Sequence, residues 1–156
     1  FGTPRQLTDL DLLRFNVPML LIAPGITERF GQRNDIVGTQ VDVVPTIMGR
    51  LGGAVQQQCW GRDLLALPAG DKGFGVIKPS GGGQTVGLLR GDELVVQPRG
   101  EQPRAYRYQL GPQATVTEQA HVPGDLQEQL KAYVQTATSA LLEDRVGVEV
   151  AAGKEG

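Results

Sequence analysis

The residue types that could do chemistry are few in this chain and lie far apart. The single histidine, His121, has no second histidine or cysteine nearby, so a metal site or a catalytic triad lacks partners within the chain. Cys59 adjoins Trp60 in an apolar loop without a neighbouring base. We therefore expect His121 to be a surface or helix-entry residue and Cys59 to be a buried structural thiol.

One glycine-rich segment, Lys78–Thr85, superficially resembles a phosphate-binding loop. Such a loop needs Gly-Lys-Ser/Thr at the start of a helix, so that backbone amides and the lysine reach the phosphates. Here the lysine precedes the glycines and a strand pattern follows them. We interpret the segment as a hairpin connection.

The charged residues of the first half show no metal-ligand spacing. The acids considered are Asp9, Asp11, Glu28, Asp35, Asp42 and Asp63. Among them, Asp42 suits the N-terminus of a helix, where backbone amides and the helix dipole favour a carboxylate. Guanidinium groups match phosphate and sulfate geometry, but solvated side chains are the ordinary expectation for the arginines, which are Arg5, Arg14, Arg29, Arg33 and Arg62.

Length and composition restrict the class of protein. The 156 residues suffice for one domain, or for one core with a small subdomain. The net charge of -2 gives no argument for a nucleic-acid partner. No apolar run approaches the roughly 18 residues of a membrane-spanning helix. The single cysteine excludes an intrachain disulfide.

The first half is expected to contain a strand followed by a helix. Val17–Ala23 is apolar without alternation, which is typical of a strand buried on both faces in the middle of a parallel sheet. Thr39 and Asp42 predict a capping box at the start of the helix. Pro45 is expected to bend this helix in its second turn, and Gly52-Gly53 to end it.

The second half is expected to form a small antiparallel sheet and a C-terminal helix. The composition shifts near Pro68–Gly73, and we divide the chain there into residues 1–72 and 73–156. The predicted strands are Gly75–Lys78, Gln84–Arg90, Glu93–Gln97 and Ala105–Leu110, with a two-residue turn at Gly91-Asp92. Apolar residues with helical spacing predict a helix from Pro123 or Asp125 to Glu143. The expected fold class is α/β.

Three motifs together resemble the C-terminal part of sulfatases of the alkaline phosphatase superfamily. They are Phe15–Gly25 (FNVPMLLIAPG), Val37–Met48 (VGTQVDVVPTIM) and Gly61–Leu65 (GRDLL). Their order and spacing are closest to the branch of lipoteichoic acid synthases and bacterial phosphoglycerol transferases. The resemblance implies that residues 1–72 are the C-terminal portion of an alkaline-phosphatase-like core.

In this family an Asp-His pair that ligates the metal is often followed by an aromatic residue and glycine. Phe1-Gly2 resembles that continuation, so the resemblance makes Phe1, Gly2, Thr3 and Arg5 neighbours of the substrate site. It assigns no catalytic residue and no metal ligand to this chain. It implies a parent enzyme that uses a divalent metal (Mn, Mg, Ca or Zn), and no metal bound by this chain alone. It also implies upstream membrane helices and a periplasmic location, on the extracytoplasmic face of a bacterial inner membrane.

Two hypotheses of function follow. In the first, the chain is part of a metal-dependent hydrolase or transferase, inactive alone because the nucleophile and the metal ligands lie upstream. Its partner is then the missing N-terminal part of the same protein, and a homo-oligomer is an alternative. In the second, the chain is a self-sufficient, non-catalytic binding or interaction module. The discriminating feature is Val17–Ala23, because a complete module must supply neighbours for both edges of this strand.

Overall fold

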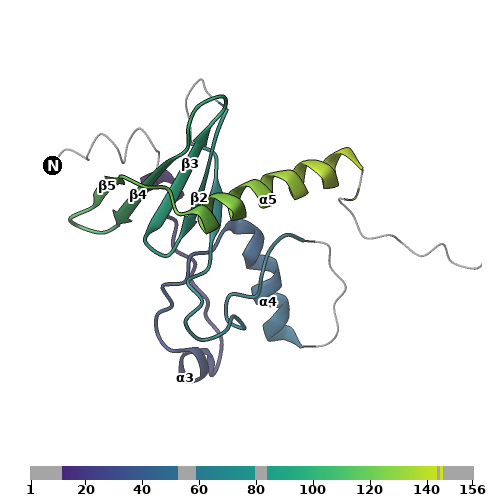
Figure 1. Cartoon of the computed structure of the whole chain (residues 1–156). Helices are drawn as coiled ribbons and strands as arrows, with labels where there is room; N and C mark the ends of the chain where they lie inside the picture. The colour runs from purple at the N-terminus through teal and green to yellow at the C-terminus, as the bar shows by residue number, and fades with distance from the viewer. Residues whose placement is uncertain (1–11, 53–58, 80–83, 144, 146–156) are drawn as a thin grey trace, which may run out of the picture.

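The computed structural model describes residues 12–52, 59–79, 84–143 and 145. Within this part, the chain has an α/β fold with an antiparallel sheet and a long C-terminal helix (Figure 1). The elements before the sheet are short and are joined by irregular backbone.

Five strands form the sheet, in the order β1-β2-β3-β4-β5 with antiparallel neighbours throughout. They are β1 (Gly75–Ile77), β2 (Thr85–Arg90), β3 (Glu93–Pro98), β4 (Arg104–Gln109) and β5 (Thr115–Gln119). Arg90 pairs with Glu93, so Gly91-Asp92 is the predicted two-residue turn. Gly91 has a φ of 61°, which glycine adopts without steric cost. The four predicted strands are confirmed, whereas β5 was missed.

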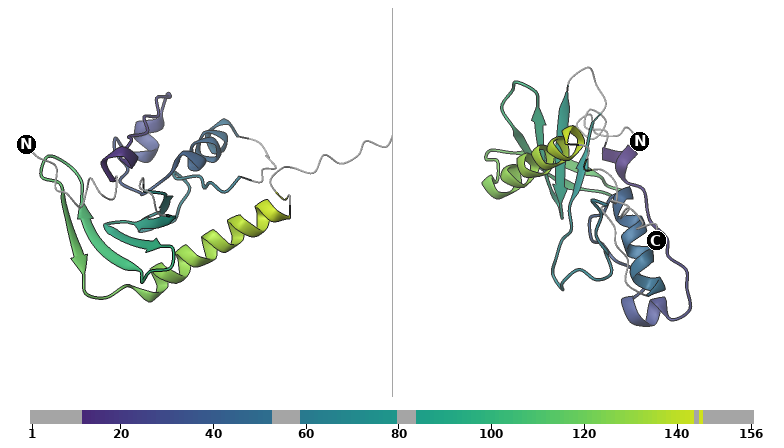
Figure 2. Two further views of the ribbon diagram at one scale, coloured as in Figure 1. Left: turned by 90° about the horizontal axis from the view of Figure 1, so that it is seen from above. Right: turned by 90° about the vertical axis from the view of Figure 1, so that its right-hand side faces the viewer.

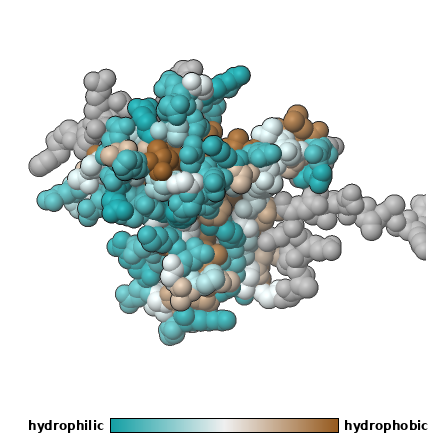
Figure 3. Space-filling view, in the orientation of Figure 1, coloured by the Kyte–Doolittle hydropathy of each residue, from teal (hydrophilic) through white to brown (hydrophobic). Residues whose placement is uncertain are grey.

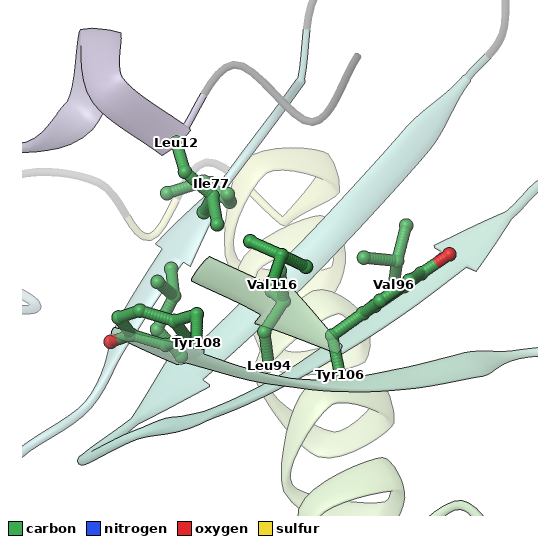
Figure 4. Packing of buried hydrophobic residues seen from close by; sticks show 8 residues of the cluster. Leu12, Ile77, Leu94, Val96, Tyr106, Tyr108 and Val116 are labelled. Carbon is green, nitrogen blue, oxygen red and sulfur yellow. The ribbon is translucent and has the colours of Figure 1, made fainter. Parts of the chain in front are cut away.

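Each face of the sheet has its own hydrophobic core. On one face, Leu88, Val95 and Ala105 pack against Leu126 and Leu130 of α5 (Gly124–Leu142). The other face carries residues of all five strands together with Leu12 of the short helix α2 (Leu12–Phe15), as Figure 4 shows. They are Ile77, Leu89, Leu94, Val96, Tyr106, Tyr108 and Val116. Figure 2 shows α5 on one side of the sheet and the N-terminal helices on the other.

The remaining elements are α3 (Ile26–Phe30), a 3-10 turn η1 (Gln40–Asp42) and α4 (Val43–Leu51). The predicted capping box is confirmed: Thr39 and Asp42 exchange side-chain and backbone hydrogen bonds. Gly52, with a φ of 77°, ends α4 as predicted. The predicted position of Pro45 in the second turn is wrong, because α4 begins at Val43 and Pro45 lies in its first turn, where no backbone donor is needed; the bend itself stays a prediction.

The predicted strand Val17–Ala23 is also wrong within the described residues. The segment runs between α2 and α3 without helix or strand structure. Val17, Leu20 and Ile22 are exposed. No strand of the described part lies beside it, since the sheet contains only β1 to β5. The segment therefore lacks the neighbours that a buried strand needs.

The two parts of the chain contact each other at several points. Val37 forms an isolated parallel bridge with Gly73, and the Val37 N–H donates to the Lys72 carbonyl. Leu12 completes the core of one sheet face. The division at residues 72 and 73 stays a prediction, but the first part is anchored to the sheet.

Candidate functional site

The predicted neighbours of a substrate site, Phe1, Gly2, Thr3 and Arg5, lie outside the described residues. Among the described residues, the buried polar side chains are Asp42 and Thr46, at the start of the helical segment η1–α4. We describe this cluster as the Asp42 network: Thr39, Asp42, Thr46, Arg62 and Leu64. It joins two of the three motifs of the sequence.

The Asp42 carboxylate is almost fully buried, with 1% of the residue exposed. Its Oδ2 accepts from the Thr39 N–H at 2.7 Å and from Arg62 Nη2 at 3.2 Å. Its Oδ1 accepts from the Arg62 N–H at 2.7 Å and from Arg62 Nε at 3.3 Å. A buried carboxylate is tolerated when it is paired and hydrogen-bonded, and Asp42 satisfies both conditions.

Arg62 is a structural partner of Asp42 rather than a solvated side chain, which corrects the sequence prediction. Its Nη2 also donates to the Phe74 carbonyl at 2.7 Å, and its guanidinium lies 3.9 Å from the centre of the Phe74 ring. The Phe74 ring in turn contacts Tyr133 of α5 edge-on. Arg62 thus connects the start of η1–α4 to the sheet and, through Phe74, to α5.

Thr46 joins the same two segments through its hydroxyl group. The Thr46 Oγ1 donates to the Asp42 carbonyl at 2.7 Å and accepts from the Leu64 N–H at 3.0 Å. The residue is 1% exposed, so no water can replace these partners without rearrangement. The adjacent residues Pro45 and Thr46 therefore have distinct roles. Pro45 lies in the first turn of α4, and Thr46 holds the Gly61–Leu65 loop.

Replacing Thr46 by valine is expected to lower the free energy of unfolding by about 1–2 kcal/mol, because the partly buried Leu64 N–H loses its acceptor. Thr138→Val is the matched control, since Thr138 Oγ1 makes the same bond to the carbonyl four residues earlier, but on the exposed side of α5. Urea unfolding of both variants measures the difference. Equal effects of the two substitutions would contradict this role for Thr46.

A second ion pair lies beside the Asp42 network. Arg50 Nη2 donates to Asp63 Oδ2 at 2.6 Å, and the Arg50 guanidinium lies 4.7 Å from the centre of the Phe30 ring. A Cβ atom on Gly49 would lie 2.0 Å from Asp63 Oδ2, so glycine allows this close approach. Arg50 and Asp63 thereby fix the loop to α4, while the buried Arg50 Nε has no hydrogen-bond partner among the described residues.

The pKa of Asp42 gives the network a pH dependence. Burial by itself raises the pKa of this carboxyl, but the hydrogen bonds from the Arg62 side chain and backbone lower it more, so the net shift is downward. A lowered folded-state pKa means that the stabilisation is complete above the ordinary aspartate pKa and is lost as the pH falls below it.

We therefore expect acidification from about pH 5 to about pH 2 to destabilise the wild type more than the Asp42→Asn variant. The physical reason is that only the wild type must protonate a carboxylate that accepts hydrogen bonds in the folded state. Urea unfolding at a series of pH values gives the two slopes. Parallel curves for the two proteins would show that Asp42 does not carry this dependence.

The other candidates of the sequence have ordinary surroundings. His121 is exposed, as predicted, and it borders a pocket of about 80 Å³ that is too small for most ligands. Cys59 is exposed, so its predicted burial is wrong. Lys78 follows β1, and β2 begins at Thr85. A strand rather than a helix therefore follows the glycine-rich segment, as predicted.

Large apolar side chains are exposed in several places before the sheet, among them Leu13 and Phe15 of α2, Val41 and Trp60. In the segment after α2, the exposed residues are Val17, Met19, Leu20 and Ile22. On α4, they are Val44, Ile47 and Leu51. The face seen in Figure 3 is mainly hydrophilic over the sheet, and apolar side chains also gather at the far end of α5, where Leu141 and Leu142 are exposed.

The described residues contain no group of three or more His, Cys, Asp or Glu side chains that could hold a metal ion. The donors of this part therefore do not fit the divalent metal that the family resemblance implies. None of the described helices has the length and apolar character needed to cross a membrane.

No protein-family model, curated protein or solved structure matches this chain. The geometry and the sequence motifs are thus the basis for the assignment that follows.

Proposed function

We propose that the chain is the C-terminal portion of a metal-dependent enzyme of the sulfatase type, within the alkaline phosphatase superfamily. The reaction is sulfate ester hydrolysis or phosphoglycerol transfer. The hydroxyl nucleophile and the metal ligands then belong to an upstream part of the polypeptide. We expect upstream helices to anchor the enzyme on the extracytoplasmic face of a bacterial inner membrane.

The observation that carries the proposal is the Asp42 network. The motifs Val37–Met48 and Gly61–Leu65 were recognised only by their residue types and spacing. Asp42 and Thr46 of the first motif contact Arg62, which lies within the second motif. A shared local fold gives a reason for these contacts between the two motifs. The network therefore supports the family assignment.

This chain supplies structure rather than chemistry to the proposed reaction. When bound to the upstream part, the divalent metal would activate the nucleophile and neutralise the anionic ester. Since the described residues do not form its site, no catalytic step is assigned to them. Their role is structural: they form the capped helix η1–α4, the Gly61–Leu65 loop that is bonded to it, and the sheet to which both are attached.

The test compares the isolated chain with the longer polypeptide that carries it, on an aryl sulfate and an aryl phosphodiester with Mn²⁺. The longer polypeptide is expected to turn over one of the two esters and to lose this activity with a chelator. The isolated chain is expected to be inactive on both. Metal-dependent turnover by the isolated chain, or none by the longer polypeptide on either ester, would refute the proposal.

The alternative is a self-sufficient binding or interaction module. The observation that favours it is the sheet with α5, whose two cores take only Leu12 and the partly buried Val37 from the first half of the described residues. This alternative gives no reason for the exposed segment Val17–Ile22. Size-exclusion chromatography and hydrogen exchange on the isolated chain distinguish the two, because a complete module should be monomeric with this segment protected.

A further inference from the structure

The second half of α5 extends past the sheet, as Figures 1 and 2 show. The buried residues of this helix are Leu126 and Leu130, in its first two turns. Arg90 of β2 holds the same end of the helix, because its Nη2 donates to Asp125 Oδ2 at 2.6 Å. Beyond Leu130, no residue of α5 is buried. The second half of the helix therefore depends on contacts outside the core of the sheet.

This second half has a low intrinsic tendency to be helical. It contains Thr136 and Thr138, whose β-branched side chains lower helix propensity. Their hydroxyl groups donate to the Ala132 and Val134 carbonyls at 2.8 Å each, and such bonds slightly destabilise a helix. Short helices of this kind are marginal in water without tertiary packing. The order of the second half of α5 is thus set by the residues that it touches.

Tyr133 provides the tertiary contact in this part of α5. Its ring centre lies 5.5 Å from that of Trp60 and 6.2 Å from that of Phe74, edge-on in both cases. Aromatic pairs with this geometry contribute more than the apolar area that they bury. We call Trp60, Phe74 and Tyr133 the aromatic bridge. Its other end lies at the Gly61–Leu65 loop, which Trp60 immediately precedes.

Arg62 of this loop supports the aromatic bridge a second time. Its guanidinium lies 3.9 Å from the centre of the Phe74 ring and donates to the Phe74 carbonyl at 2.7 Å. The same guanidinium pairs with Asp42. Release of the loop from Asp42 would therefore move Trp60 and the cation over Phe74 together. Tyr133 would lose one ring partner, and the other ring would lose its support.

The closed position of the loop is sharply defined. A Cβ atom on Gly61 would lie 1.8 Å from the Val41 carbonyl oxygen, so the two backbones are in direct contact. The next amide, that of Arg62, donates to Asp42 Oδ1 at 2.7 Å. Closely packed elements take discrete positions rather than a continuous range. The loop is thus a two-state element that is either closed on η1 or released from it.

We propose that the aromatic bridge couples the second half of α5 to the closure of the Gly61–Leu65 loop on Asp42, so that the two open and close as one unit. A partner that stabilises the closed loop then also orders α5. A partner of α5 stabilises the loop by the same factor, because coupling between two sites is reciprocal. This device goes beyond the proposed reaction and does not depend on it.

Hydrogen exchange in Tyr133 variants tests the coupling from the helix to the loop. Tyr133→Leu keeps an apolar side chain but removes the ring, so the Arg62 and Leu64 amides are expected to exchange about three- to tenfold faster. The Tyr108 amide in β4 is the reference and should keep its rate. Tyr133→Phe keeps the ring and should leave all three rates unchanged. Unchanged Arg62 and Leu64 rates in Tyr133→Leu, or equal acceleration of all three amides, would overturn the proposal.

The reverse direction gives an independent readout. Arg62→Lys keeps the positive charge but loses the planar guanidinium that contacts Phe74. The Ala137 amide, in the second half of α5, is expected to exchange faster by a similar factor. Arg33→Lys alters an exposed ion pair and is the matched control, which should leave this amide unchanged. If Arg62→Lys accelerated the Leu64 amide without affecting Ala137, the loop would open alone and the proposal would be overturned.

Discussion

Replacing Asp42 by alanine is expected to destabilise the chain by about 3 kcal/mol, which makes it one of the two most damaging single changes considered. The substitution leaves the partly buried Arg62 guanidinium without its counter-charge and removes the acceptor of the Thr39 N–H. Loss of a buried partner costs more than the pair itself contributes, because the remaining charge stays desolvated. Urea unfolding measures the loss.

Asp35→Ala is the control for this substitution, because Asp35 also pairs with an arginine, Arg33, but on the surface. Exposed pairs contribute little, so we expect a change within about 0.5 kcal/mol. The double variant Asp42→Ala/Arg62→Ala should be less destabilised than the sum of its single variants, since it leaves no unpaired charge. Additive effects would show that the two side chains are not coupled.

Leu94→Ala is expected to lower the free energy of unfolding by about 3 kcal/mol. Leu94 is 0% exposed and is the second residue of β3, which lies between β2 and β4, and it belongs to the core cluster that also contains Tyr106, Ile77 and Leu12. The truncation removes buried methyl groups and leaves a cavity that the paired strands cannot close. The same core anchors α2, so the loss should extend beyond the sheet.

Leu142→Ala provides the comparison, since Leu142 is 80% exposed near the end of α5. Its effect should be within about 0.5 kcal/mol. Hydrogen exchange of the α2 amides in Leu94→Ala checks the second part of the prediction. If Leu94→Ala unfolded with the wild-type midpoint, the core assigned to this face of the sheet would be wrong.

Short-range features of the fold could be predicted from the sequence. Thr39 and Asp42 are three positions apart, so their capping box needs only the local chain. Gly91-Asp92 fixes the register of β2 and β3 through the turn itself. The long helix α5 follows from its apolar spacing. In contrast, β5 contains a single buried apolar residue, Val116, and an edge strand of this kind has little pattern to detect.

The Asp42 network was predicted only in part. The sequence indicated that Asp42 belongs at a helix N-terminus, but its pairing with Arg62 joins positions twenty residues apart. Such a contact depends on how the intervening loop closes, and composition alone does not specify this. For the same reason Arg50 and Asp63 were not matched, and Cys59 was expected inside although its loop leaves it exposed.

The sequence by itself determined a cap at Asp42 and a turn at Gly91, whereas the burial that it predicted for Val17–Ala23 is not met within the described residues. These requirements follow from side-chain polarity and backbone geometry within a few residues. Only the tertiary structure decided which requirements the described part of the chain meets. It closes Arg62 onto Asp42, but it leaves Val17–Ile22 exposed because burial needs surfaces from elsewhere, and local sequence cannot supply them.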